Sequence, residues 1–322
     1  MEDTLLEVRD LQVEFSTKMG IVRVLDKVNL KVDPRQTVGI IGESGCGKSM
    51  MALSIMGLVP IPPGRIAGGE ILYRGTDLLT LGKDAILDIR GKRIAMIFQE
   101  PMNSLNPGFT VGNQLVETLL RHEDMTRRDA WDKSIDMLKA VGIPSPEKRM
   151  HDYSFQMSGG MRQRVMIAMS LCLDPDILIA DEPTTALDVT VQAQILDLLR
   201  EMQDRVGASI IMITHDLGVV AEVSDKVAVM YAGRKVEEGS VEQILFNPQH
   251  PYTKALKGCI PHLQRTPTSG RHRLHEIPGM VLGMDRCSFY ERCPCGKPEC
   301  MEHNPPAKAI DAGHEVACWL YS

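Results

Sequence analysis

The chain has 322 residues, and its 43% of apolar and 24% of charged residues are ordinary for a globular protein. This length suits one large domain with an appendage or two modest domains, and the formal net charge of −6 argues against a general nucleic-acid binder. The N-terminal stretch MEDTLLEVRD lacks the basic segment and apolar core of a signal peptide, and no apolar run reaches the roughly 20 residues of a membrane span. We therefore expect a soluble, cytosolic protein.

Residues 5–40 alternate apolar and polar side chains in short runs, which predicts antiparallel strands. The apolar run TVGII at 37–41 then predicts a buried strand, and MMALSIMGL at 50–58 predicts a helix. Between them lies GESGCGKS at 42–49, whose glycines let successive N–H groups point inward at an anion. Lys48 in such a loop reaches the β- and γ-phosphates, and the Ser49 hydroxyl ligates Mg²⁺. The loop predicts nucleoside triphosphate binding, against the alternative of a glycine-rich turn with a chance lysine.

The middle of the chain is predicted to be largely helical. A strand or hairpin at 69–79 and an apolar strand in RIAMIFQEP at 93–101 precede this region. Residues 110–122 and 126–142 then carry apolar side chains at helical spacing, and Gly142 is the predicted C-cap of the second helix. After about Gly239 the sequence becomes rich in Pro, Gly and His, which predicts an irregular tail.

Two further apolar runs, DILIADEP at 176–183 and SIIMITHD at 209–216, predict strands buried on both faces of a parallel sheet. Ligands bind beyond the carboxyl ends of such strands, where Asp181 is suited to hold Mg²⁺ and Glu182 to act as general base. Gln99 and His215 end two other strands. Each residue alone also fits a structural role at a strand exit, but their agreement across separate segments favours one site.

The stretch MSGGMRQRVMIAMSL at 157–171 places a serine and two glycines before a helix that is predicted to start near Met161. Ser158, Gly159 and Gly160 therefore form a second anion site. Since one phosphate loop does not need a second anion site in the same fold, we expect this one to bind the γ-phosphate of ATP held by another subunit.

With these motifs the sequence resembles the ATP-binding cassette (ABC) ATPases over residues 5–240. The phosphate loop, Gln99 as the Q-loop, MSGGM as the signature, ILIADE as the Walker B strand, ALD at 186–188 as the D-loop and His215 as the switch histidine follow the family's order. The signature departs from the commoner LSGGQ at Met157 and Met161, while its Ser-Gly-Gly core is intact. The resemblance implies an active ATPase that works as a head-to-tail dimer.

The resemblance also implies a set of site residues. Phe15 would stack on adenine, with a role as a core strand residue as a close alternative. Asp188 belongs to the D-loop, Ser49, Gln99 and Asp181 would hold Mg²⁺, and Glu182 and His215 would be catalytic. ATP would bind Phe15, Gly42, Ser44, Gly45, Cys46, Gly47, Lys48, Ser49 and Gln99, with Ser158, Gly159 and Gly160 acting on the partner's ATP.

Several longer stretches, among them IADEPTTALDVTVQAQI and NPQHPYTKAL, are similar to the ATPases of oligopeptide, dipeptide and nickel importers. This resemblance implies two membrane permeases, a second homologous ATPase in a heterodimer, and an extracytoplasmic binding protein, with the chain on the cytoplasmic face of the membrane. The segment between Phe98 and the signature would receive the permease. Alternatives are a nickel or oligosaccharide importer, and a soluble ABC protein of DNA repair or translation.

Five of the eight cysteines lie in the last 36 residues, and with no secretory signal such a group indicates metal more than disulfides. Four thiolates suit either Zn²⁺ or an iron–sulfur cluster, and the spacing lacks the C-x2-C pairs usual for zinc. By resemblance to importer ATPases with this tail, a 4Fe-4S cluster is expected on Cys287, Cys293, Cys300 and Cys318, with Cys295 as an additional thiol or an alternative ligand. Zinc with mixed ligands and reduced cysteines without metal stay as alternatives.

The fold class that follows is α/β, a P-loop NTPase (RecA-like) core with an antiparallel β-subdomain, an inserted helical subdomain and an irregular Cys-rich C-terminal extension. We expect the nucleotide-binding core at 1–100 and 165–240, the helical subdomain at 101–164, and the extension at 241–322.

Overall fold

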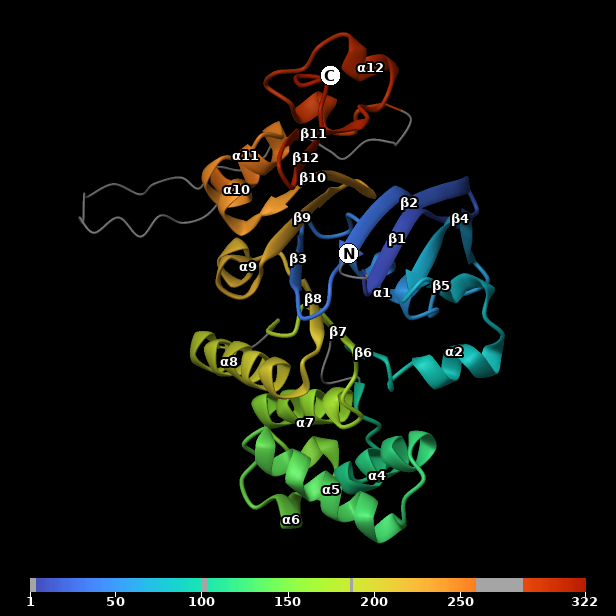
Figure 1. The fold of residues 1–322 in the computed structure, drawn as a ribbon, viewed down its shortest axis with the longest axis vertical. Coiled ribbons are helices and arrows are strands. Elements are labelled where there is room, and N and C mark those ends of the chain that lie inside the picture. Colours follow the sequence, from blue (N-terminus) through green and yellow to red (C-terminus); the bar gives the residue numbers. More distant parts are fainter. Residues whose placement is uncertain (1–3, 100–103, 186–187, 259–285) are drawn as a thin grey trace, which may run out of the picture. The chain divides into compact units, whose positions relative to one another are not determined.

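The structure is a computed structural model that describes residues 4–99, 104–185, 188–258 and 286–322 (Figure 1). The chain divides into two compact units. The helical unit comprises Met1–Leu5, Val32–Thr37 and Asp77–Ile213, and the phosphate-loop unit comprises Leu6–Lys31, Val38–Thr76 and Thr214–Ser322. The helices among the described residues are too short or too polar to span a bilayer.

The phosphate-loop unit contains an antiparallel sheet in the order β2-β1-β4, built from β1 (Leu6–Thr17), β2 (Gly20–Val32) and β4 (Gly64–Tyr73). The two-residue strand β5 (Thr76–Asp77) follows β4 in this order. Strands β1 and β4 pair from Leu6 opposite Tyr73 to Phe15 opposite Gly64. The antiparallel arrangement expected within residues 5–40 is confirmed for this sheet, because alternation of apolar and polar side chains matches a sheet with one buried face.

A second sheet of this unit carries the strand that leads into the phosphate loop. In it, β3 (Thr37–Ile41) pairs in parallel with β9 (Lys226–Tyr231), and β10 (Arg234–Ser240) runs antiparallel to β9. Every residue of β3 is buried. Helices α1 (Lys48–Ile55) and α9 (Leu217–Val223) belong to the same unit. The predicted strand, loop and helix around 37–58 are confirmed.

The C-terminal tail is more regular than the sequence predicts. It contains α10 (Val241–Phe246), α11 (Pro251–Gly258), the 3-10 turn η3 (Tyr290–Arg292), α12 (Glu299–Glu302) and the hairpin of β11 (Ala307–Asp311) and β12 (His314–Ala317). Strand β12 pairs with β10 and so extends the sheet. The hairpin strands have five and four residues, too few for alternation to stand out in a Pro-rich sequence.

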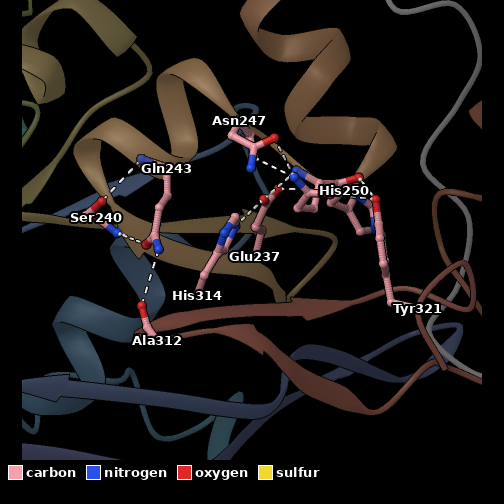
Figure 2. A network of polar contacts seen from close by, with 9 residues as sticks. Glu237, Ser240, Gln243, Asn247, His250, Ala312, His314 and Tyr321 are labelled. Atoms are coloured by element: carbon pink, nitrogen blue, oxygen red, sulfur yellow. Dashed lines mark hydrogen bonds and ion pairs between the residues drawn. The ribbon is translucent and has the colours of Figure 1, made fainter.

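A buried carboxylate ties this tail to the sheet (Figure 2). Glu237 of β10 accepts hydrogen bonds from the backbone N–H of Gln249 at 2.6 Å and of His250 at 2.9 Å, and it contacts Nε2 of His314 at 2.8 Å. Burial lowers the pKa of His250 to about 3, so its ring is neutral, and Nδ1 accepts the N–H of Tyr252 at 3.0 Å. One carboxylate thereby holds three separate segments of the chain together.

The helical unit contains the parallel strands β6 (Ile94–Ile97), β7 (Ile177–Asp181) and β8 (Ser209–Ile213), in the order β8-β7-β6. All three strands are buried along their whole length, which confirms for β7 and β8 the burial predicted from their unbroken apolar runs. A short helical segment before them consists of η1 (Leu78–Thr80) and α2 (Lys83–Ile89).

The remaining helices of this unit appear in green and yellow in Figure 1: α4 (Val111–His122), α5 (Arg127–Ala140), α6 (Pro146–Arg149), η2 (Ser154–Gln156), α7 (Gly159–Leu171) and α8 (Val189–Val206). Thr110 and Thr126 cap α4 and α5 with their hydroxyls. Helix α5 ends just before Gly142, whose φ of +73° is the left-handed conformation of a helix terminus, as predicted.

Candidate functional site

The phosphate loop, residues 42–49, joins β3 to α1. Gly42 and Gly47 have φ values of +155° and +104°, and a Cβ atom would collide with the Met230 carbonyl oxygen at the first and approach Leu25 to 2.7 Å at the second. Only glycine adopts such φ values easily and has no Cβ atom to collide with these neighbours. The two glycines therefore allow the curved backbone of the loop. A loop curled in this way is suited to surround a phosphate, the role that the G-x4-G-K-S spacing predicts.

Lys48, the first residue of α1, is 5% exposed, and its ammonium group donates to the carbonyl oxygens of Gly42 at 2.8 Å and Glu43 at 3.0 Å. Ser44 and Gly45 are exposed at the crest of the loop. Cys46 is buried, and burial raises the pKa of its thiol, so it acts as a neutral apolar filler. The loop thus presents a lysine, a serine and backbone amides, which suit a triphosphate.

Two further predicted residues belong to the phosphate-loop unit. The N–H of Thr214 donates to the Ile40 carbonyl at 3.2 Å, so the exposed His215 lies beside the end of β3, close to where the loop begins. Phe15 is half-buried, and the tip of its ring would lie 2.9 Å from a Cβ atom at Gly64, which shows that the ring packs over this glycine. Its role at adenine stays a prediction.

The helical unit brings together two residues predicted from separate segments. Nε2 of Gln99 donates to Oε2 of Glu182 at 3.1 Å, and the Thr185 hydroxyl donates to the same oxygen at 2.8 Å. Glu182 has a φ of +47°, which non-glycine residues rarely adopt, and Asp181 before it ends β7 at 3% exposure. Such backbone strain clusters at functional sites. A carboxylate oriented by an amide and a hydroxyl is suited to accept a proton from water.

The signature segment forms the N-terminus of α7. The Ser158 hydroxyl caps this helix by accepting the Met161 N–H at 3.4 Å, and the helix begins at Gly159, slightly earlier than predicted. Gly159 carries no side chain at this helix N-terminus, and a Cβ atom there would meet no heavy atom within 4 Å outside the helix's own backbone. Met157 is 3% exposed, which makes this departure from the common signature a core residue.

The D-loop prediction is only partly within the described residues. Asp188 is exposed and caps α8 by accepting the Val191 N–H at 3.0 Å. Ala186 and Leu187 lie outside the described residues.

Sequence reasoning missed the side chains that brace these motifs. Gln163 of α7 is fully buried and donates from Nε2 to the Pro183 carbonyl at 2.6 Å, which joins the signature helix to the segment after Glu182. Arg292 and Tyr252 contact Glu43 of the phosphate loop at 2.9 Å each. A glutamine inside a helix and an arginine in a charged tail carry no sequence signal for such contacts.

The predicted ligands of the C-terminal cluster come from η3, α12 and the segments next to them. Cys300 and Cys318 are buried, Cys287 and Cys293 are half-buried, and Cys295 is exposed. Burial, to which the neighbouring thiols add, raises the pKa of Cys287 to about 11. Within the described parts of the chain, no group of three or more His, Cys, Asp or Glu residues is placed to hold a metal ion. The structure therefore gives no support to the predicted four-thiolate site, which stays a prediction.

A family model described as "ABC transporter" matches residues 25–185. The probable peptide ABC transporter ATP-binding protein y4tR of Sinorhizobium fredii is 49% identical over 321 residues, which are 98% of this chain and 95% of that protein. The chain belongs to the ABC transporter family. This membership confirms the predicted class of enzyme, an ATPase that couples ATP hydrolysis to transport.

Other comparisons extend the likeness of this ABC ATPase to its tail. A model described as "Oligopeptide/dipeptide transporter, C-terminal region" matches residues 236–300. The oligopeptide transport ATP-binding protein OppD of Bacillus subtilis is 47% identical over 98% of this chain and 88% of its own length. The dipeptide transport ATP-binding protein DppD of the same species is 47% identical over 99% of this chain and 95% of its own length.

Solved structures agree with the fold. A dimeric structure of a post-hydrolysis state of the ATP-binding cassette MJ0796, bound to ADP and Pi, has a TM-score of 0.65 at 25% identity. It covers 73% of this chain and 98% of that chain. CbiO1 from Clostridium perfringens, part of the ABC transporter complex cbiONQ, has a TM-score of 0.65 at 27% identity. The match covers 76% of this chain and 92% of that chain. The predicted P-loop NTPase fold is confirmed.

Proposed function

We propose that this ABC ATPase powers the import of di- and oligopeptides through a membrane transporter. The observation that carries the proposal is the end-to-end likeness to peptide importer subunits, including a C-terminal region matched by the peptide transporter model at 236–300. The intact Glu182 with its orienting partners supports hydrolysis rather than nucleotide binding alone.

For the ATP site, we propose the roles that the motifs predict. Lys48 and the loop amides hold the phosphates, Ser49, Gln99 and Asp181 hold Mg²⁺, and Glu182 is the general base. His215 contacts the γ-phosphate and the attacking water. Phe15 stacks on adenine, and Ser158, Gly159, Gly160 and Asp188 act on the ATP of the partner subunit.

For the assembly, we propose two permeases, a second homologous ATPase and an extracytoplasmic binding protein, with this chain on the cytoplasmic face of the membrane. The expected division into a core at 1–100 and 165–240, a helical subdomain at 101–164 and an extension at 241–322 belongs to the same proposal. The helical unit exposes large apolar side chains that suit a docked permease, among them Phe98 at 40%, Phe109 at 51% and Phe155 at 64%.

The test is uptake by the complete transporter, reconstituted in vesicles that contain MgATP. A labelled peptide added with the binding protein accumulates in the vesicles, and accumulation requires ATP inside. Nickel or an oligosaccharide offered in the same way is not taken up. Accumulation of either of these with no uptake of di- or oligopeptides would assign the chain to another branch of the importers.

For the C-terminal thiols, we propose a structural 4Fe-4S cluster on Cys287, Cys293, Cys300 and Cys318, with Zn²⁺ as the alternative. This proposal rests on the number and spacing of the four cysteines in the sequence and not on their placement in the structure. It assigns the cluster no step in ATP hydrolysis.

The test uses protein purified without oxygen. Its absorbance near 400 nm, together with assays of iron, zinc and acid-labile sulfide on the same sample, distinguishes the cluster from Zn²⁺. A cluster gives a broad absorbance with about four irons and four sulfides per chain. One zinc without colour would replace the cluster by the alternative, and no metal would refute both. Replacement of the exposed Cys295 by serine, as control, leaves the metal content unchanged.

A further inference from the structure

Glu43, the second residue of the phosphate loop, forms an ion pair with a residue 249 positions away. Nη1 of Arg292 donates to Oε2 of Glu43 and Nη2 donates to Oε1, both at 2.9 Å. Arg292 ends η3 in the C-terminal extension, here residues 241–322. This two-bond, planar geometry is the strong form of an arginine–carboxylate contact, because it fixes orientation as well as distance.

Arg292 is held in place by aromatic residues. Its side chain is 5% exposed, its Nη1 also donates to the Tyr231 hydroxyl at 3.0 Å, and its Cζ lies 5.7 Å from the Tyr231 ring centre and 6.0 Å from that of Phe289. A guanidinium that is buried beside two aromatic rings in this way loses little further freedom when it pairs with a carboxylate. The contact with Glu43 is therefore preorganised, unlike an exposed surface pair.

The extension also holds the backbone of Glu43. The Glu43 N–H donates to the Tyr252 hydroxyl at 2.9 Å, while the Glu43 carbonyl accepts from Lys48 at 3.0 Å. Tyr252 is fully buried, and its ring centre lies 4.6 Å from that of Tyr231. Side chain, N–H and carbonyl of one loop residue are thus all fixed, two of them by residues beyond 240.

We propose that the C-terminal extension positions the phosphate loop for ATP, with Arg292 and Tyr252 as positioning residues that act through Glu43. Neither residue touches the proposed phosphate site itself. A loop that is already fixed in its curled form pays less conformational entropy when the triphosphate binds, so the contact raises ATP affinity rather than the rate of hydrolysis. The inference rests on the proposed ATP site.

The alternative is that the ion pair only attaches the extension to the rest of the unit. However, the extension has a separate anchor in the Glu237 network, where His314 and the backbone of 249 and 250 meet one carboxylate (Figure 2). Strand β12 also pairs with β10. Loss of Arg292 therefore leaves the extension attached, and the positioning role can be tested by itself.

The test is Arg292→Gln in the full-length chain. Titration with a fluorescent ATP analogue and Mg²⁺ gives a Kd about tenfold higher than wild type, the scale expected for losing hydrogen bonds to a charged group. In the reconstituted transporter, KM for ATP rises by a similar factor, while kcat stays within about twofold of wild type. A role in attachment alone would not change KM without changing kcat in this way. Glu43→Gln gives the same shift, and the double variant is no weaker than either single variant, because both remove one interaction.

Arg286→Gln is the matched control. It removes an arginine from an ion pair in the same extension, that of Arg286 with Glu291 at 3.1 Å, and it leaves ATP affinity unchanged. An unchanged Kd in Arg292→Gln and Glu43→Gln, or an equal loss in Arg286→Gln, would overturn the proposal. Lys48→Ala distinguishes failure of the positioning role from failure of the proposed ATP site. If Lys48→Ala has a higher Kd for ATP while Arg292→Gln binds ATP like wild type, the positioning role is refuted and the proposed site stands.

Discussion

Glu182→Gln lowers ATP hydrolysis about a hundredfold or more at saturating MgATP, the scale of losing a general base. The amide cannot take a proton from the attacking water. It retains an oxygen that can accept from the Thr185 hydroxyl, which in wild type lies 2.8 Å from the carboxylate. ATP binding is therefore preserved, and the variant accumulates as an ATP-bound closed dimer. Phosphate release and size-exclusion chromatography with ATP measure the two effects.

The control for this variant is Glu201→Gln, which removes a carboxylate from the exposed surface of α8. It hydrolyses ATP like wild type and does not accumulate the dimer. If Glu182→Gln instead turned over within about twofold of wild type, Glu182 would not be the base, since general base catalysis contributes at least about 10² to the rate.

Lys48→Ala lowers ATP affinity on the order of a hundredfold, because the variant removes the buried cation that we propose pairs with the phosphates and leaves the bound anion unpaired. Lys48 is 5% exposed and lies at the start of α1, where the helix N-terminus alone cannot replace a full charge. Titration with a fluorescent ATP analogue gives the Kd.

A suitable control is Lys83→Ala, because Lys83 is likewise the first residue of a helix, α2, but is exposed. This variant binds ATP like wild type. Unchanged binding by Lys48→Ala would refute the assignment of the phosphate loop.

The sequence allows prediction of those features that depend on local spacing. The phosphate loop is contained in eight consecutive residues between a strand and a helix, so its conformation follows from its own glycines. The contact of Gln99 with Glu182 spans 83 positions and was still predictable, because both residues end parallel strands and such ends share one edge of a sheet.

Other contacts depend on packing that no local pattern encodes. Arg292 in the sequence YERCPC has the pattern of a solvated surface charge, but its side chain is buried, and the rings of Tyr231 and Phe289, which meet edge to face, lie next to its guanidinium. The carboxylate of Glu237 likewise lies in a strand with charged neighbours, yet it is fully buried, because the backbone N–H groups of Gln249 and His250 donate to it and His314 contacts it. Tertiary packing decides the environment of both residues.

The most direct measurement of the central claim follows phosphate release and peptide uptake in the same vesicles, with wild-type transporter and with Glu182→Gln in this chain. The account predicts that labelled peptide accumulates only while phosphate is released, and that both stop together in the variant. Peptide accumulation that continues in Glu182→Gln without phosphate release would contradict it, because transport would then not depend on hydrolysis at this subunit.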